Sequence, residues 1–145
     1  MPKYELRIPS SREDWHAYHS IRRKVLFENR GQFGVYDENH PDEHSKGNHP
    51  LLLFLDDEAI GVIRVDINGD RGIFRRVAIR EDLQRAGHGR VLLTLAESFA
   101  QERGCLQIWS DVARDVVGFY ERCGYMFVPS AAMTGTSISM QKNLA

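Results

Sequence analysis

The amino-acid sequence predicts an α/β fold with a mixed, mostly antiparallel central sheet and helices on both faces. Residues 51–79 contain three runs rich in β-forming residues, separated by short polar turns, which is the pattern of an antiparallel meander. Helical segments flank this meander near residues 10–31 and 87–103. A buried strand, a short helix and further strands follow, so a strand–helix–strand crossover completes the sheet.

Length and composition indicate one ordinary globular domain, expected to span residues 1–145. The formal net charge of −1 gives no reason to expect a nucleic acid or an acidic membrane as partner. The first ten residues lack the features of a secretory leader, and the apolar run Leu-Leu-Leu-Phe is too short to cross a bilayer. The two cysteines suggest neither a disulfide framework nor a zinc ribbon. We therefore expect a soluble, cytoplasmic protein, either a monomer or a homodimer.

The N-terminal part reads as a strand, a helix and a long loop. Residues 3–8 alternate in polarity like a short strand. Ser11 and Asp14 form a candidate capping box for the helix that follows, and Gly31 is a plausible stop. Residues 32–50 are polar and weakly patterned, which predicts a loop with at most a helical turn.

The rest of the chain is predicted to form strands and helices, with glycines at a turn and at the helix ends. Asn68-Gly69 is a strong hairpin signal inside the meander. Gly104 is the expected left-handed stop of the helix that begins near Gly87. Residues 106–111 read as a buried strand and residues 114–124 as a short helix closed by Gly124. Residues 125–129 and 137–140 finish as strands.

The helix that begins near Gly87 lacks the serine, threonine, aspartate or asparagine that usually caps a helix. Gly87 and Gly89 leave its first backbone N–H groups open, and a phosphate is a favoured acceptor there. A Walker loop requires a lysine and then a serine or threonine after its last glycine, and neither follows Gly89. A dinucleotide fingerprint requires a third glycine, and Leu92 stands at that position. A glycine-rich turn that merely allows tight packing remains the alternative.

Two stretches around this helix resemble the GCN5-related N-acetyltransferase (GNAT) superfamily. The sequence Gln-Arg-Ala-Gly-His-Gly of residues 84–89, preceded by Val-Ala-Ile, is similar to the family signature Gln/Arg-x-x-Gly-x-Gly/Ala. Residues 116–128, Val-Val-Gly-Phe-Tyr-Glu-Arg-Cys-Gly-Tyr-Met-Phe-Val, look like its second signature. The predicted element order matches too, so the resemblance covers nearly the whole chain.

The resemblance implies acetyl-coenzyme A as cosubstrate and no metal. It assigns the pyrophosphate to the loop before the helix and the pantetheine arm to the backbone of the preceding strand, with residues 106–110 as the neighbouring strand. Arg85 and Arg90 could add to the positive field there, and Gln84 could orient the loop or bond the ligand. The His88 amide is expected to contribute, with the imidazole near the phosphates or solvent. The cofactor-binding residues implied are Val77, Ala78, Ile79, Gln84, Arg85, Gly87, His88, Gly89 and Arg90.

The chemistry that the resemblance implies is direct attack of a neutral amine on the thioester. A backbone N–H of residues 77–79 can polarise the carbonyl as negative charge develops. Tyr120 matches the family tyrosine that often protonates the departing thiolate, and its phenol is a donor at neutral pH. The alternative for Tyr120 is a core aromatic without a catalytic role.

The sequence departs from the family pattern at two places. Ala113 stands where many members carry a cofactor-contacting asparagine, and arginines replace the glutamate that often serves as base on the central strand. The base is therefore unassigned. The candidates are Glu28, the acids and histidines of residues 36–49, Asp111, and a chain of waters.

Charged clusters leave two further possibilities open. Arg75 and Arg76 are neighbours on a strand and face opposite sides of a regular sheet, so one of them could bind an anionic group on the acceptor. An ion pair with an acid of the adjacent strand, such as Asp66, is the favoured interpretation. The histidines of residues 40–49 could ligate a metal with Asp42 and Glu43, although irregularly spaced loop histidines are mostly solvated.

The sequence thus predicts an N-acetyltransferase that acts on a primary amine of a small molecule or a peptide. The alternative from another class is a non-catalytic acyl-coenzyme A-binding sensor or regulatory module, which the unassigned base and Ala113 keep open. A metal-dependent enzyme that uses the histidine loop is the third interpretation, and it would require bound metal.

Overall fold

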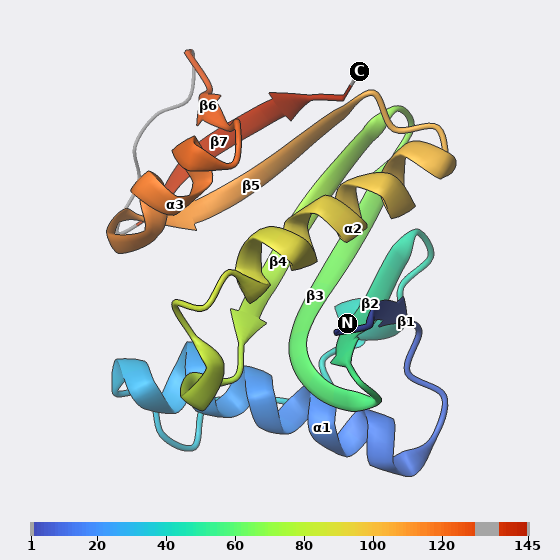
Figure 1. Cartoon of the computed structure of the whole chain (residues 1–145), viewed down its shortest axis with the longest axis vertical. Helices are drawn as coiled ribbons and strands as arrows, with labels where there is room; N and C mark the ends of the chain where they lie inside the picture. The colour runs from blue at the N-terminus through green and yellow to red at the C-terminus, as the bar shows by residue number, and fades with distance from the viewer. Residues whose placement is uncertain (1, 130–136, 145) are drawn as a thin grey trace.

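The structure is a computed structural model that describes residues 2–129 and 137–144, and its strands form a single sheet (Figure 1). The strand order is β1-β2-β3-β4-β5-β7-β6. The strands are β1 (Tyr4–Arg7), β2 (Asn48–Leu55), β3 (Glu58–Asn68), β4 (Arg71–Ile79), β5 (Gln107–Ala113), β6 (Met126–Phe127) and β7 (Ser137–Asn143). The α-helices are α1 (Arg12–Arg22), α2 (His88–Glu102) and α3 (Val117–Arg122), and short helical turns connect several of these elements.

The sheet is mixed and mostly antiparallel, as the sequence predicts. Strands β1 to β4 pair antiparallel in chain order, with the turn at Gly69 joining β3 and β4. Strands β4 and β5 pair parallel, because α2 carries the chain back across the sheet between them. Strand β7 then lies between β5 and β6 and is antiparallel to both.

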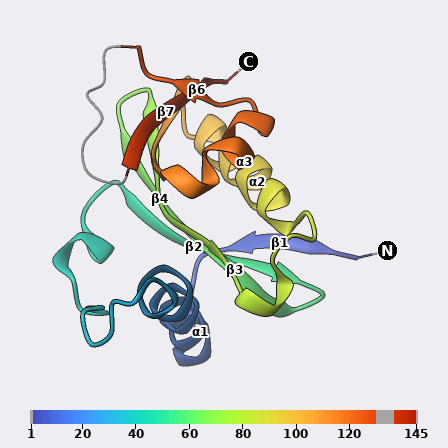
Figure 2. The same ribbon diagram turned by 90° about the vertical axis from the view of Figure 1, so that its left-hand side faces the viewer.

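Helices cover both faces of the sheet, with α1 on one face and α2 and α3 on the other (Figure 2). The alternation of side chains along β2 divides the core into two clusters. Leu51 and Leu53 pack in the cluster that contains Leu92 and Ala96 of α2. Leu52 and Phe54 pack with Tyr18 and Ile21 of α1. This double burial explains why residues 51–54 form a continuous apolar run.

The first helix begins with the predicted capping box, since the Asp14 N–H donates to Ser11 Oγ over 3.0 Å and Asp14 Oδ2 accepts from the Ser11 N–H. The helical path continues past α1 through a π-helical turn, Arg23–Phe27, and a 3₁₀ turn, Glu28–Arg30, before Gly31 ends it with φ +82°. The sequence pattern predicts one uninterrupted helix over this stretch. The π turn inserts an extra residue, and such turns are frequent at functional sites.

The remaining helices and loops end close to the residues at which the sequence predicts their ends. Gly104 and Gly124 adopt φ of +93° and +94° directly after α2 and α3. Within residues 32–47 the structure contains one 3₁₀ turn, Pro41–His44, which agrees with a loop holding a single helical turn. The short α3 is preceded by a 3₁₀ turn, Arg114–Val116, so the connection from β5 to α3 is compact.

Candidate functional site

Strands β4 and β5 part from each other halfway along the sheet. Their parallel pairing runs only from Arg71 opposite Gln107 to Phe74 opposite Ser110. At this last pair the buried Ser110 hydroxyl donates to the Phe74 carbonyl oxygen over 3.2 Å. Beyond it, the two strands leave unpaired backbone edges facing each other. We call this opening the β4–β5 gap.

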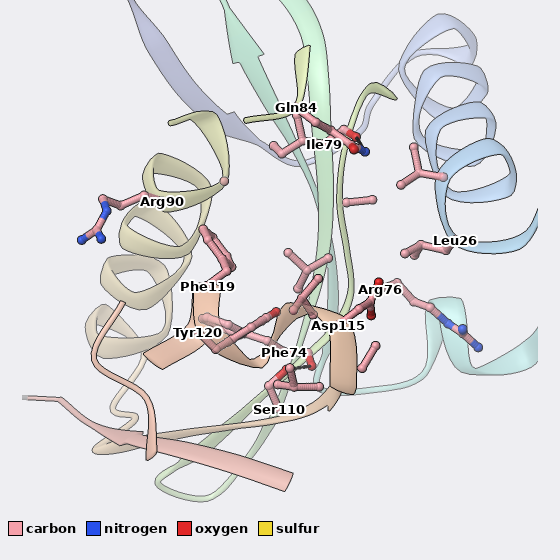
Figure 3. Close-up of a pocket in the computed structure, with 18 of the residues that line it drawn as sticks. Leu26, Phe74, Arg76, Ile79, Gln84, Arg90, Ser110, Asp115, Phe119 and Tyr120 are labelled. Carbon is pink, nitrogen blue, oxygen red and sulfur yellow. Dashed lines mark hydrogen bonds between the residues drawn. The ribbon is translucent and has the colours of Figure 1, made fainter. Parts of the chain in front are cut away.

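A cleft of about 1110 Å³ occupies the β4–β5 gap and reaches both faces of the sheet (Figure 3). One side is lined by the α2 start and α3, and the other by the turns that follow α1. The lining includes Val25, Leu26, Asn29, Arg30, Phe74, Arg76, Val77, Ala78, Ile79, Leu83, Gln84, Arg85, Gly87, Gly89, Arg90, Ser110, Asp111, Val112, Ala113, Asp115, Val116, Gly118, Phe119, Tyr120, Arg122 and Ser137. All the cofactor-binding residues implied by the sequence except His88 are among them.

The start of α2 forms one end of the cleft, and no side chain caps it. Gly87 occupies the cap position with φ +88°, a left-handed conformation that glycine adopts without strain. A Cβ added at Gly89 would lie 3.0 Å from Phe119 Cζ, so α3 packs directly on the first turn of α2. The first N–H groups of α2 therefore lie at the cleft with the positive end of the helix dipole, which suits an anion.

Two polar side chains, one in the preceding loop and one in the first turn of α2, hold this helix start in place. The Gln84 side-chain amide donates to the Ile79 carbonyl over 3.0 Å, so Gln84 orients the loop. Arg85 is exposed and left-handed, with φ +63°. Arg90 donates to the Arg122 carbonyl over 3.1 Å and thereby links α2 to the end of α3. Both arginines lie at the rim of the cleft and supplement the positive field there.

The His88 side chain makes a contact that the sequence interpretation did not include. Its Nδ1 lies 2.8 Å from the hydroxyl of Tyr4 on β1, and the two rings lie 5.8 Å apart. His88 is absent from the cleft lining, although the glycines on both sides of it belong there. The imidazole therefore ties the α2 start to β1, and only the backbone of His88 remains available to a ligand in the cleft.

Tyr120 is both a core residue and part of the cleft wall. Its ring extends from α3 toward β4 and β5 (Figure 3) and packs edge-on against Phe119 and Tyr125. Burial raises the pKa of Tyr120 to about 12, although a hydrogen bond with Ser110 acts in the opposite direction. The phenol therefore stays protonated through the neutral range and can donate a hydrogen bond in the cleft.

Strand β4 carries a bulge beside the β4–β5 gap that the sequence interpretation missed. Val62 pairs with Ala78 and Arg64 with Arg75, so one residue of β3 lies opposite both Arg76 and Val77. Arg76 adopts φ +57°, a conformation that is rare for a residue with a side chain. Apolar alternation alone does not reveal such a bulge; the β-rich run simply reads as a regular strand.

The two adjacent arginines of β4 have different environments. Arg75 donates to Asp66 over 3.0 Å, which confirms the favoured interpretation for that residue. Arg76 instead lines the cleft and extends away from Tyr120 toward the side of the turns after α1 (Figure 3). Its guanidinium lies 5.1 Å from the centre of the Phe27 ring.

The candidate bases occupy different positions relative to the cleft. Asp111 and Asp115 line it, and Asp111 accepts a hydrogen bond from the Ser139 hydroxyl over 2.9 Å. Asp115 lies 3.5 Å from Arg30. Glu28 is not among the lining residues that the structure describes. Ala113 lines the cleft, so a larger polar residue at this position would have faced it.

The histidine loop does not gather into a metal site in the part of the chain that the structure describes, where no group of three or more potential ligands meets. Glu43 is buried and pairs with Arg22, and it accepts a hydrogen bond from the Tyr18 hydroxyl over 2.9 Å. His44 packs edge-on against Trp15, and His49 against Phe99. None of the helices that the structure describes is long and apolar enough to cross a membrane.

Comparisons with known proteins agree with this architecture. A sequence model of the family described as "Acetyltransferase (GNAT) family" matches residues 6–125. A Bacillus subtilis (strain 168) protein named as a candidate acetyltransferase is 28% identical over 122 residues, which cover 80% of this chain and 79% of the relative.

Solved structures superpose over almost the whole chain. The crystal structure of a candidate N-acetyltransferase from Lactobacillus plantarum is 27% identical, with a TM-score of 0.78 over 99% of both chains. That of the PaiA N-acetyltransferase from Thermoplasma acidophilum, in complex with coenzyme A, has a TM-score of 0.74 over 98% of this chain and 99% of the other. Its identity is 21%, so this second likeness concerns the fold alone.

Proposed function

The chain belongs to the acetyltransferase (GNAT) family, and on that premise we propose that it transfers an acetyl group from acetyl-coenzyme A to a primary amine of a small molecule or peptide. Family membership supports acyl-coenzyme A-dependent N-acyl transfer in general. The observation that carries the more specific proposal is the β4–β5 gap, which joins an uncapped helix start and a protonated tyrosine in one cleft.

We assign the pyrophosphate of the cosubstrate to the start of α2. The uncapped N–H groups after Gly87 are donors without a side-chain acceptor, and the helix dipole favours negative charge at this end. Gly89 carries no side chain, which leaves room for the ring of Phe119 against the first turn of α2. Arg85 and Arg90 at the rim would attract the phosphates from solution.

We assign the pantetheine arm to the β4–β5 gap. Its amides can pair with the unpaired backbone edge of residues 77–79, in the manner of an added strand. The solved complex of the Thermoplasma acidophilum protein with coenzyme A is consistent with a fold of this kind holding that ligand. The chain's own uncapped helix start and parted strands provide the donors that such a ligand needs.

The bound cosubstrate would supply a thioester carbonyl as acyl donor. In the step that we propose, a C–N bond forms between the amine and this carbonyl carbon, and the C–S bond breaks to release the thiolate. A backbone N–H at the β4 bulge would donate to the carbonyl oxygen as its negative charge grows. Tyr120 would donate its phenolic proton to the sulfur, because burial keeps that phenol protonated.

The proton that the amine loses needs an acceptor within one water of the cleft. Asp111 and Asp115 are the carboxylates that line the cleft among the described residues. Asp115 already lies near Arg30, whereas the hydrogen bond of Asp111 comes from a neutral serine. We therefore propose that the proton leaves through water toward Asp111.

The test is calorimetric titration of the purified protein with acetyl-coenzyme A, followed by thiol release across a broad panel of amines. Binding together with release for one class of amine is the expected result. Binding without release from any amine would favour the alternative of a non-catalytic sensor. If acetyl-coenzyme A does not bind, the assignment of the cleft is wrong.

A further inference from the structure

The side of the cleft opposite Tyr120 carries an arginine that, among the described residues, stacks on an aromatic ring but makes no ion pair. Arg76 projects there from the β4 bulge, near Leu26 and Phe27 (Figure 3). Within residues 2–129 and 137–144, no carboxylate lies within ion-pair distance of its guanidinium, and no side-chain hydrogen bond holds it. Residues 130–136 contain no acidic side chain that could supply one. The positive charge of Arg76 is thus directed at the cleft and is not neutralised by a carboxylate of the described residues.

In the part of the chain that the structure describes, Arg76 belongs to a group of four arginines that has only two carboxylate partners, whereas Asp111 and Asp115 of the cleft wall make no ion pair with Arg76. Buried Arg22 pairs with Glu43, while Arg64 and Arg75 both donate to Asp66. These three arginines already use both carboxylates, and Arg76 adds a fourth guanidinium. Partial burial in the cleft, and the charges of Arg22 and Arg64, lower the pKa of Arg76, although this residue still reaches solvent. An arginine nevertheless stays protonated in proteins, so the excess positive charge persists.

The backbone conformation that directs Arg76 into the cleft is itself costly. A residue with a side chain at φ +57° is strained, and such strain is found where the surrounding structure and function require it. In a regular strand, Arg76 would lie in register with β3 like its neighbours. The bulge thus places the guanidinium at the cleft beside the backbone that the proposed function assigns to the thioester.

We infer that the acceptor is an amine that also carries a carboxylate, as a free amino acid does, and that Arg76 binds this carboxylate. This inference rests on the proposed function. The planar guanidinium matches a carboxylate with two parallel hydrogen bonds, and the anion would offset the excess positive charge of the arginine group. Leu26 and Val25 on the same side leave an apolar surface for the rest of the acceptor.

The test compares matched pairs of amines that differ only in the carboxylate, such as L-phenylalanine with 2-phenylethylamine and L-lysine with 1,5-diaminopentane. The readout is the ratio of kcat/KM within each pair, measured by thiol release. For the intact protein we expect the amino acid to be favoured about tenfold or more in the best pair, as a charged, bidentate hydrogen bond allows. In Arg76→Gln this ratio should fall by about tenfold, through a higher KM for the amino acid.

Arg75→Gln is the matched control, because Arg75 is the adjacent arginine but already pairs with Asp66. Its ratio should stay within about twofold of the original, as expected for a surface ion pair. The change in ratio between variants is decisive, since the two amines of a pair also differ in basicity. A ratio that survives Arg76→Gln would overturn the inference.

A second measurement does not depend on the folding of a variant. For the intact protein, 3-phenylpropionate should inhibit more strongly than 3-phenylpropanamide, which has the same shape without the charge. Equal inhibition by the two compounds contradicts a carboxylate site. If thiol is released but the protein does not prefer the amine that carries a carboxylate, this inference alone is rejected. If no amine causes thiol release, the proposed function is rejected as well.

Discussion

The ring of Phe119 lies against Gly89, so close that a Cβ at this glycine would come within 3.0 Å of Phe119 Cζ. This contact joins two segments that are separate in the sequence, the glycine-flanked start of α2 and the Phe-Tyr pair of α3. The same contact places Tyr120, the next residue after Phe119, at the wall of the cleft that α2 begins. The spacing between the proposed phosphate site and the proposed proton donor therefore depends on a glycine.

Gly89→Leu should weaken coenzyme A binding by about tenfold or more, since its side chain would displace Phe119 and cover the open N–H groups. Calorimetric titration measures the affinity. Thr94→Leu is the control, because Thr94 is exposed on the same helix and lies outside the cleft. Unchanged affinity in Gly89→Leu would show that the phosphates bind elsewhere.

Gly87→Ala and Gly104→Ala should destabilise the protein to a similar degree. Both glycines are left-handed, with φ +88° and +93°, and an added Cβ at either would meet nothing within 4 Å. The expected loss is about 1–2 kcal/mol in the free energy of unfolding, which urea denaturation measures. Only Gly87→Ala should also alter coenzyme A affinity. Equal effects of both variants on affinity would argue against a ligand at Gly87.

Tyr120→Phe should lower kcat by about tenfold or more while leaving coenzyme A affinity within about twofold. The substitution removes only the hydroxyl, so the packing against Phe119 and Tyr125 is retained. Tyr125→Phe serves as control: its hydroxyl donates to Glu97 over 2.8 Å, away from the cleft. That control should change stability but not turnover. Equal turnover of Tyr120→Phe and the unmodified protein would remove Tyr120 as donor.

The effect of Tyr120→Phe should not depend on pH between about 7 and 10. Burial raises the pKa of Tyr120 to about 12, and the form that would donate the proton in the proposed step is the protonated phenol, which is present at all pH values well below that. With an ordinary pKa near 10, the phenol would begin to ionise in this range, and the advantage of the unmodified protein would shrink. Rates of both forms across this range test the point.

Glu43→Gln should destabilise the fold by about 3 kcal/mol, since it leaves the buried guanidinium of Arg22 without a counter-charge. Glu38→Gln is the control, because Glu38 pairs with Arg23 at 2.9 Å on the surface. Its cost should stay within about 1 kcal/mol. Urea denaturation of both variants gives the comparison. A similar small loss in both would mean that the buried pair contributes little.

Local patterns predicted the elements of the fold because each pattern has a local physical cause. The capping box of Ser11 and Asp14, the turn at Gly69 and the left-handed stops at Gly104 and Gly124 all lie where the sequence predicts them. Apart from the meander and the pairing of residues 77–79 with residues 106–110 as neighbouring strands, which the family resemblance implied, the order of strands in the sheet was not predicted, because periodicity alone does not give it. The resemblance also marked the glycines and Tyr120, and the structure brings these residues to one cleft.

Features that depend on contacts between distant segments were not predictable in the same way. The buried pair of Arg22 and Glu43 joins a helix to a loop whose acids were predicted only as candidate bases or metal ligands. The contact of His88 with Tyr4 spans most of the chain, and neither residue signals it. The bulge at Arg76 depends on the register between two strands, which short-range alternation does not fix.

The short pairing of β4 with β5 has a consequence for motion. Because their parallel pairing ends at Phe74 and Ser110, the sheet consists of a block of four strands and a block of three that share a narrow seam. Small rotations about this seam would cost few hydrogen bonds, so we expect the two blocks to fluctuate against each other more than the strands within each block. A ligand that forms hydrogen bonds with the edges of both β4 and β5 would restrict this motion. Its binding would then slow the exchange of backbone amide hydrogens in both blocks.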